Sequence, residues 1–122
     1  AAGVAALYSA GVYQGKEVEG GLKYLLRNKN NAQNPHFRFA MRRDLPDIHY
    51  YYGHYYAAQV MWTAGGKYWS EWYPFIRDEL LERAGSSGKD GAWEDQIDSH
   101  YATAMACIIL QIPNNYLPIM QK

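Results

Sequence analysis

Histidine and cysteine are among the residues of this chain that could hold a metal ion or act as a nucleophile. His49 and His54 are five residues apart on an expected helix, which places their side chains about 140° apart around its axis. Cys107 is the one cysteine of the chain. It lies in the apolar run Ala106-Cys107-Ile108-Ile109-Leu110 and is expected to be a buried apolar side chain. These positions do not form a metal-ligand set, and the sequence predicts neither a bound metal nor a redox cofactor.

Acidic residues precede two expected helices and could supply a proton. A strong acid requires carboxylates that tune one another, but Asp44 and Asp47 are not adjacent. We therefore interpret Asp47 as a helix cap and Asp44 as a solvated loop charge. His100 follows Asp98 and Ser99 at a helix start, where capping, with Ser99 as the expected cap, accounts for these residues. No glycine-rich phosphate loop and no nucleophile elbow occur in the sequence, so it identifies no catalytic residue and disfavours an enzyme.

Aromatic residues form the densest group with chemical potential. One expected helix carries six large rings, at Tyr50, Tyr51, Tyr52, Tyr55, Tyr56 and Trp62. Such rings could face a cation, or they could fill the space between diverging helices while their hydroxyls reach backbone or water; the second interpretation is favoured. The best candidates for a binding site lie near the starts of the apolar helices, namely Tyr52, His54, Tyr55, Asp98 and His100.

Two kinds of helix are expected to position these residues. Outer helices carry an apolar stripe on one side: Val18, Leu22, Leu25 and Leu26, then Trp69, Trp72, Tyr73, Ile76 and Leu80. Inner helices, over residues 48–64 and 101–110, are apolar nearly all round and are expected to be surrounded by protein. Pro74 is placed in or near the first turn of its outer helix. Gly65-Gly66 and Pro113 are expected to end the inner helices, and residues 85–91 form a turn.

Composition excludes several classes of protein. The chain has 122 residues, of which 48% are hydrophobic, and its formal net charge is zero. It is therefore expected to form a single domain over residues 1–122, or a fragment of a larger one. A net charge of zero lacks the excess of positive charge that is typical of proteins that bind nucleic acid. No apolar run reaches the roughly 20 residues that span a bilayer.

A pattern of two helices occurs three times along the chain. A small-residue apolar helix is followed, after a turn with glycine or proline, by a second helix. The first helices lie near residues 5–11, 56–66 and 101–107, and the second near 21–26, 76–81 and 116–120. Self-similarity at roughly 45 residues is typical of stacked units that bury their apolar faces against each other. The sequence therefore predicts an all-α protein, an α/α superhelix of about three helix pairs.

Several of these residues resemble a known repeat family. Leu80-Leu81, the later Asp90-Gly91-Ala92-Trp93, Trp69 with Trp72, and residues 101–106 resemble the prenyltransferase/squalene oxidase repeat of squalene and hopene cyclases and protein prenyltransferase β subunits. The likeness is greatest to uncharacterised bacterial members. It implies a partial α/α toroid. Ala84 replaces the glutamine that the repeat carries after Leu-Leu, and a complete ring needs more helix pairs than this chain supplies.

The resemblance leaves more than one function open. The leading hypothesis is a non-catalytic module that binds a protein partner or a hydrophobic, isoprenoid-like ligand. The alternative is a fragment of a terpenoid-cyclase-like or prenyltransferase-like enzyme, with catalytic residues outside this chain, and a purely structural scaffold is a third possibility. The open inner face of an incomplete ring predicts self-association, or cover by a neighbouring segment.

Overall fold

The protein is all-α, as the sequence predicts. The computed structural model describes residues 1–29, 49–86 and 91–114. These ranges contain five α-helices, a final 3-10 turn and no strand. They are α1 (Ala2–Ser9), α2 (Lys16–Lys29), α3 (Tyr50–Ala64), α4 (Gly66–Ser86), α5 (Ser99–Gln111) and the 3-10 turn η1 (Ile112–Asn114). The expected caps and acids at Asp44 and Asp47, and the expected helix over 116–120, lie outside the described residues.

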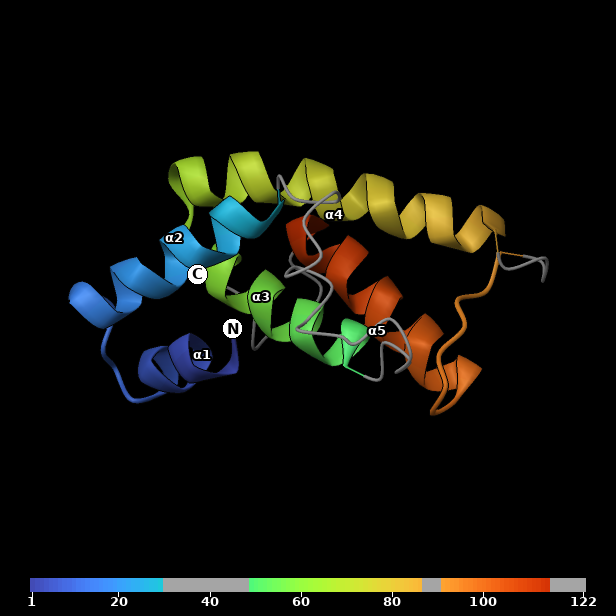
Figure 1. Ribbon diagram of the computed structural model, residues 1–122, viewed down its shortest axis with the longest axis horizontal. Helices are drawn as coiled ribbons and strands as arrows, with labels where there is room; N and C mark the ends of the chain where they lie inside the picture. Colours follow the sequence, from blue (N-terminus) through green and yellow to red (C-terminus); the bar gives the residue numbers. More distant parts are fainter. Residues whose placement is uncertain (30–48, 87–90, 115–122) are drawn as a thin grey trace.

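The helices form two layers, visible in Figure 1. The inner layer is α1, α3 and α5, with α3 in contact with both of the others; the outer layer is α2 and α4, which contact each other. α3 and α5 run in the same direction, and α4 runs back over α3 (Figure 1). α3 contacts all four other α-helices, so it is the central element of the described fold.

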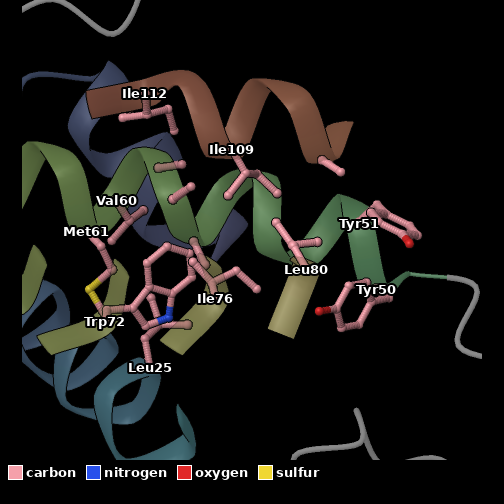
Figure 2. Packing of buried hydrophobic residues seen from close by; sticks show 14 of the residues in the cluster. Leu25, Tyr50, Tyr51, Val60, Met61, Trp72, Ile76, Leu80, Ile109 and Ile112 are labelled. Carbon is pink, nitrogen blue, oxygen red and sulfur yellow. The ribbon is translucent and has the colours of Figure 1, made fainter. Parts of the chain in front are cut away.

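The outer helices pack through the apolar stripes expected from the sequence. Val18, Leu22 and Leu25 of α2 are buried, and so are Trp72, Ile76 and Leu80 of α4. Each set repeats about every turn on one helix side. Figure 2 shows Leu25 beside Trp72 and Met61, where α2, α4 and α3 meet. Fully burying one such side chain stabilises the fold by roughly 1.5–3 kcal/mol, so these stripes hold the outer layer on the inner one.

The inner helices use small residues for close packing, but neither α3 nor α5 is fully enclosed. Ala58 of α3 and Ala102 and Ala106 of α5 are fully buried. α3 leaves Tyr52 and Thr63 exposed, and α5 leaves Ala104 and Cys107 exposed. The expectation that both apolar inner helices are surrounded by protein is therefore wrong, most clearly for α5, because among the described elements it packs mainly on α3 and η1. No helix in the described part of the chain combines the length and apolarity needed to cross a membrane.

Helix ends agree with the sequence in part. α3 stops at Gly65, whose φ of 65° suits glycine, and α4 begins at the next residue. α5 ends at Gln111 ahead of Pro113. The cap of α5 is Asp98 rather than Ser99, since its carboxylate accepts hydrogen bonds from the backbone N–H groups of His100 and Tyr101.

Pro74 does not lie in the first turn of α4, as the sequence suggested; it lies inside the helix. Proline at this position removes the hydrogen bond to the Ser70 carbonyl. Both residues are exposed, so water can bind that carbonyl. The flanking Trp72 and Ile76 are buried and anchor the helix on both sides. α4 also continues to Ser86, into the turn expected from residue 85.

Candidate functional site

Tyrosine side chains gather where α3 and α5 begin. We call Tyr52, Tyr55, Tyr56 and Tyr101 the tyrosine cluster. The ring centroids of Tyr52 and Tyr56 are 4.8 Å apart, and those of Tyr55 and Tyr56 are 5.3 Å apart, both edge to face. Such pairs stabilise each other beyond their burial alone. α3 and α5 run in the same direction (Figure 1), so Tyr101, in the first turn of α5, can meet the first turns of α3.

The electrostatics of the tyrosine cluster agree with this proximity. Hydrogen bonding with Tyr56 raises the pKa of Tyr52, and the neighbouring Tyr101 hydroxyl adds a smaller contribution. Burial raises the pKa of Tyr101, and the negative charge of Asp95 raises it further. Asp95, in the loop before α5, thus acts on Tyr101 alone among the cluster residues whose pKa is shifted. Tyr52 is 46% exposed, so its ring can be reached from solvent.

Asp98 and His100 form the exposed head of α5. Besides accepting from two backbone N–H groups, the Asp98 carboxylate lies 3.0 Å from His100 Nδ1. These backbone hydrogen bonds lower the pKa of Asp98, and His100 lowers it further. The pair is thus part of the helix cap, in agreement with the interpretation made from the sequence.

His54 does not join the other expected site residues. It is buried, with 7% of its surface exposed, and its ring centroid lies 4.2 Å from that of Tyr50. His54 Nδ1 is 2.8 Å from the Tyr50 carbonyl oxygen. A carbonyl can only accept, so we assign the proton to Nδ1. Tyr52 is two residues away, or about 200° around the helix, so the two side chains leave α3 on nearly opposite sides.

A group of polar side chains between α3 and α4 was not predicted from the sequence. The Tyr50 hydroxyl donates to Glu79 Oε1 at 2.8 Å, and the Arg83 guanidinium carbon lies 3.7 Å from the centroid of the Tyr50 ring. Arg83 also pairs with Glu79 at 3.2 Å. Burial, and then the charge of Glu79, raise the pKa of Tyr50 far above its usual value. The i, i+4 spacing of Glu79 and Arg83 was the available signal for the pair; nothing in the spacing identified Tyr50 as their partner.

Cys107 is exposed, not buried as the sequence analysis expected. Its apolar neighbours suggested a core position, but it lies on the side of α5 that the described elements leave open.

No cluster of three or more histidine, cysteine or acidic side chains suited to a metal ion occurs among the described residues. His49 is exposed, with its ring centroid 6.4 Å from that of Tyr52, whereas His54 is buried.

None of the protein-family models, curated proteins or solved structures compared with this chain matches it.

Proposed function

We propose that this chain is a non-catalytic helical-repeat module that binds a protein partner through the tyrosine cluster. The observation that carries the proposal is the exposure of Tyr52, a large ring packed edge to face on Tyr56 and still 46% accessible. Tyrosine is enriched at protein interfaces because it buries much area at low conformational cost and keeps a hydroxyl for hydrogen bonding.

The surroundings of the tyrosine cluster favour binding over catalysis. Asp98 is occupied by the backbone of α5 and by His100, and His54 lies on the buried side of α3. Neither Asp98 nor His54 is therefore held against a tyrosine of the cluster in an arrangement suited to proton transfer.

The two-layer packing supports a repeat architecture. α1, α3 and α5 lie in one layer with α2 and α4 behind them (Figure 1). An arc of an α/α superhelix, similar to the prenyltransferase/squalene oxidase repeat, would have this order. Repeat arcs present extended surfaces that suit protein partners, and in this arc the tyrosine cluster lies at the start of the inner helices.

A random peptide library displayed on phage, selected against the whole chain, tests the proposal. Affinities of the selected peptides are measured by fluorescence anisotropy for the natural chain, Tyr52→Ser and Tyr24→Ser. Tyr24 is a matched control, being 54% exposed on α2. We expect Tyr52→Ser to weaken binding about tenfold or more, as for an interface hot spot, and Tyr24→Ser to leave it unchanged. If no selected peptide depends on Tyr52, the proposal is wrong.

A further inference from the structure

Charged side chains are absent from all three helices of the inner layer. α1, α3 and α5 contain no lysine, arginine, aspartate or glutamate, whereas α2 and α4 carry several. The carboxylates of residues 91–98 precede α5 and lie outside these helices. A helix side that faces water usually carries charged residues. An accessible side of an inner helix is therefore suited to an uncharged partner, because a charge buried against it finds no counter-charge.

One side of α3 stays accessible along the whole helix. Its four positions follow one another at intervals of four, three and four residues and lie within about 60° of each other around the axis. They are Tyr52, Tyr56, Gln59 and Thr63, and we call them the α3 stripe. The first and last are exposed and the middle two are partly exposed, whereas the opposite side of α3 is buried. The α3 stripe thus continues from the tyrosine cluster for about 16 Å along the helix.

Gln59 brings an unpaired amide to the α3 stripe. Its Nε2 atom is buried and has no hydrogen-bond partner among the described residues. A buried polar group without a partner is unfavourable, so a ligand that pairs with this amide relieves a cost that the free chain bears. The residue as a whole is only partly buried, and its amide can turn toward a ligand bound on the stripe. A side-chain amide of the ligand can pair with either end of the Gln59 amide, since it both donates and accepts.

The spacing of the α3 stripe indicates the shape of the partner. Positions that alternate four and three residues apart form the seam along which two helices pack side by side. A polar residue within such a seam fixes the register of the pair, because it requires a polar residue in the facing helix. Gln59 lies at such a position, between the Tyr56 ring and Thr63.

We propose that the α3 stripe binds an α-helix of a partner protein whose facing side is uncharged and carries asparagine or glutamine opposite Gln59. Apolar side chains of this helix lie against the rings of Tyr52 and Tyr56, which are 4.8 Å apart. A charged residue on the facing side is rejected, because the inner helices offer it no counter-charge. This inference rests on the proposed function above and names the chemistry of its partner.

Gln59→Met tests the unpaired amide in the free chain. Methionine is similar in size and has no donor, so we expect the melting temperature to rise by about 3 °C or more. Gln14→Met, at an exposed residue of the loop between α1 and α2, is the control and should leave the melting temperature unchanged. If Gln59→Met melts at or below the temperature of the natural chain, the amide is paired within the fold and the inference is wrong.

A phage library that displays a single α-helix, randomised at its a and d heptad positions, provides the binding probe. It is selected against the full chain, and affinities of the selected helices are measured by fluorescence anisotropy. We expect uncharged residues at the randomised positions, with asparagine or glutamine at one of them. Gln59→Met should weaken binding about tenfold although it stabilises the free chain, and Gln14→Met should leave binding unchanged.

Thr63→Lys tests the rejection of charge at the far end of the α3 stripe. Thr63 is exposed, so the free chain can accommodate lysine there. We expect the affinity for the selected helices to fall about tenfold or more. Ser70→Lys adds the same charge at an exposed position of α4 and should leave binding unchanged. Equal effects of the two substitutions would overturn the inference.

Dependence on Tyr52 distinguishes failure of this inference from failure of the proposed function. Selected helices that lose affinity both in Tyr52→Ser and in Gln59→Met support both proposals. Ligands that depend on Tyr52 but not on Gln59, or that carry charged residues at the randomised positions, would overturn the inference and leave the interaction module standing. If neither linear peptides nor helices depend on Tyr52, both proposals are wrong.

Discussion

Gly20 and Gly21 are neighbours in α2 with opposite surroundings. A Cβ added to Gly21 would collide with Cγ2 of the buried Val4 in α1, whereas one added to Gly20 would meet nothing within 4 Å. Alanine favours a helix over glycine by about 1 kcal/mol. We therefore expect Gly20→Ala to raise the free energy of unfolding by about 0.5–1 kcal/mol, and Gly21→Ala to lower it by about 1–3 kcal/mol through overpacking. Urea denaturation followed by circular dichroism measures both.

Val4→Ala provides the test of the cause. If the collision with Val4 makes Gly21→Ala unfavourable, the double variant should lose less stability than the sum of the two single variants. Additive losses would show that Gly21 is needed for a reason other than the close approach of α1 and α2.

Tyr50 gives the protein a predictable response to alkaline pH. Its pKa is raised in the folded state by burial and by Glu79, so its contribution to stability is complete below the unfolded pKa of about 10 and is lost as pH rises above it. We expect the free energy of unfolding of the natural chain to fall above about pH 10 relative to that of Tyr50→Phe, by up to about 1.4 kcal/mol per pH unit. Parallel pH curves for the two proteins would contradict this.

At neutral pH the same substitution should lower the free energy of unfolding relative to that of the natural chain. Phenylalanine keeps the ring under Arg83 but loses the 2.8 Å hydrogen bond to Glu79, and a bond to a charged partner contributes about 1.5–3 kcal/mol. Tyr50→Phe should therefore be less stable than the natural chain at pH 7. Tyr24→Phe, at an exposed tyrosine of α2, is the control and should change little.

Composition and spacing predicted which residue types lie at the site better than they predicted the side of the helix on which each side chain lies. Tyr52 and Tyr55 do lie at the head of α3, but His54, between them in sequence, turns to the buried side. Cys107 shows the same difficulty, because a run of apolar residues gives no sign of which helix side its neighbours leave open. Direction on an apolar helix is decided by which elements pack around it, and that information is not local.

At the scale of the element, the cap of α5 gives a test of helix stability. Hydrogen bonds from the backbone lower the pKa of Asp98 in the folded state, so its contribution is present above the unfolded pKa of about 3.9 and is lost as pH falls through the folded value. We expect Asp98→Ala to lower the melting temperature at pH 7. Asp98→Asn should lose less, because asparagine also caps helices.

Acid titration of the melting temperature checks this assignment. The difference between the natural chain and Asp98→Ala should shrink as the pH falls below the folded pKa, since the protonated carboxyl is a poorer acceptor. A difference that stays constant with pH would assign the effect of Asp98→Ala to something other than the charged cap.

The helices could be predicted from sequence where a pattern extended over several turns. The stripe through Trp72, Ile76 and Leu80 predicted the buried side of α4, because period and polarity agree there. Its start could not be predicted from Pro74, since burial on both sides of the proline outweighs one lost hydrogen bond. Asp98 and Ser99 are both good capping residues, so only the backbone geometry decides between them.

At the scale of the whole molecule, the two-layer arrangement follows from the alternation of apolar and amphipathic helices, but the tyrosine cluster does not. Tyr52 and Tyr101 are far apart in sequence, and they lie at the same end of the fold because α3 and α5 pack together and run in the same direction (Figure 1). The Tyr50–Glu79–Arg83 group likewise depends on how α4 runs back over α3. Contacts between helices that are distant in sequence thus determine both groups.

The central position of α3 predicts which helices unfold locally and which unfold only with the whole molecule. α3 contacts every other α-helix and contributes Val60 and Met61, which are fully buried (Figure 2). α1 contributes Val4 and Ala5 alone as buried residues. Elements with few buried contacts open at lower free energy than the whole fold. In native-state hydrogen exchange we therefore expect α3 amides to exchange only through global unfolding and α1 amides to exchange faster.

Two core truncations test this hierarchy. Met61→Ala should lower the free energy of unfolding by about 2–5 kcal/mol. It should also speed exchange of the slowest amides in α2, α3, α4 and α5 together, because α2, α4 and α5 all pack on α3, and α2 also packs on α4. Val4→Ala should speed exchange in α1 and leave the slowest amides of α3 unchanged. If Val4→Ala instead speeds exchange equally in α1 and α3, then α1 unfolds with the rest of the protein and the described helices form one cooperative unit. The comparison thus decides whether α1 opens separately from α3 or unfolds together with it.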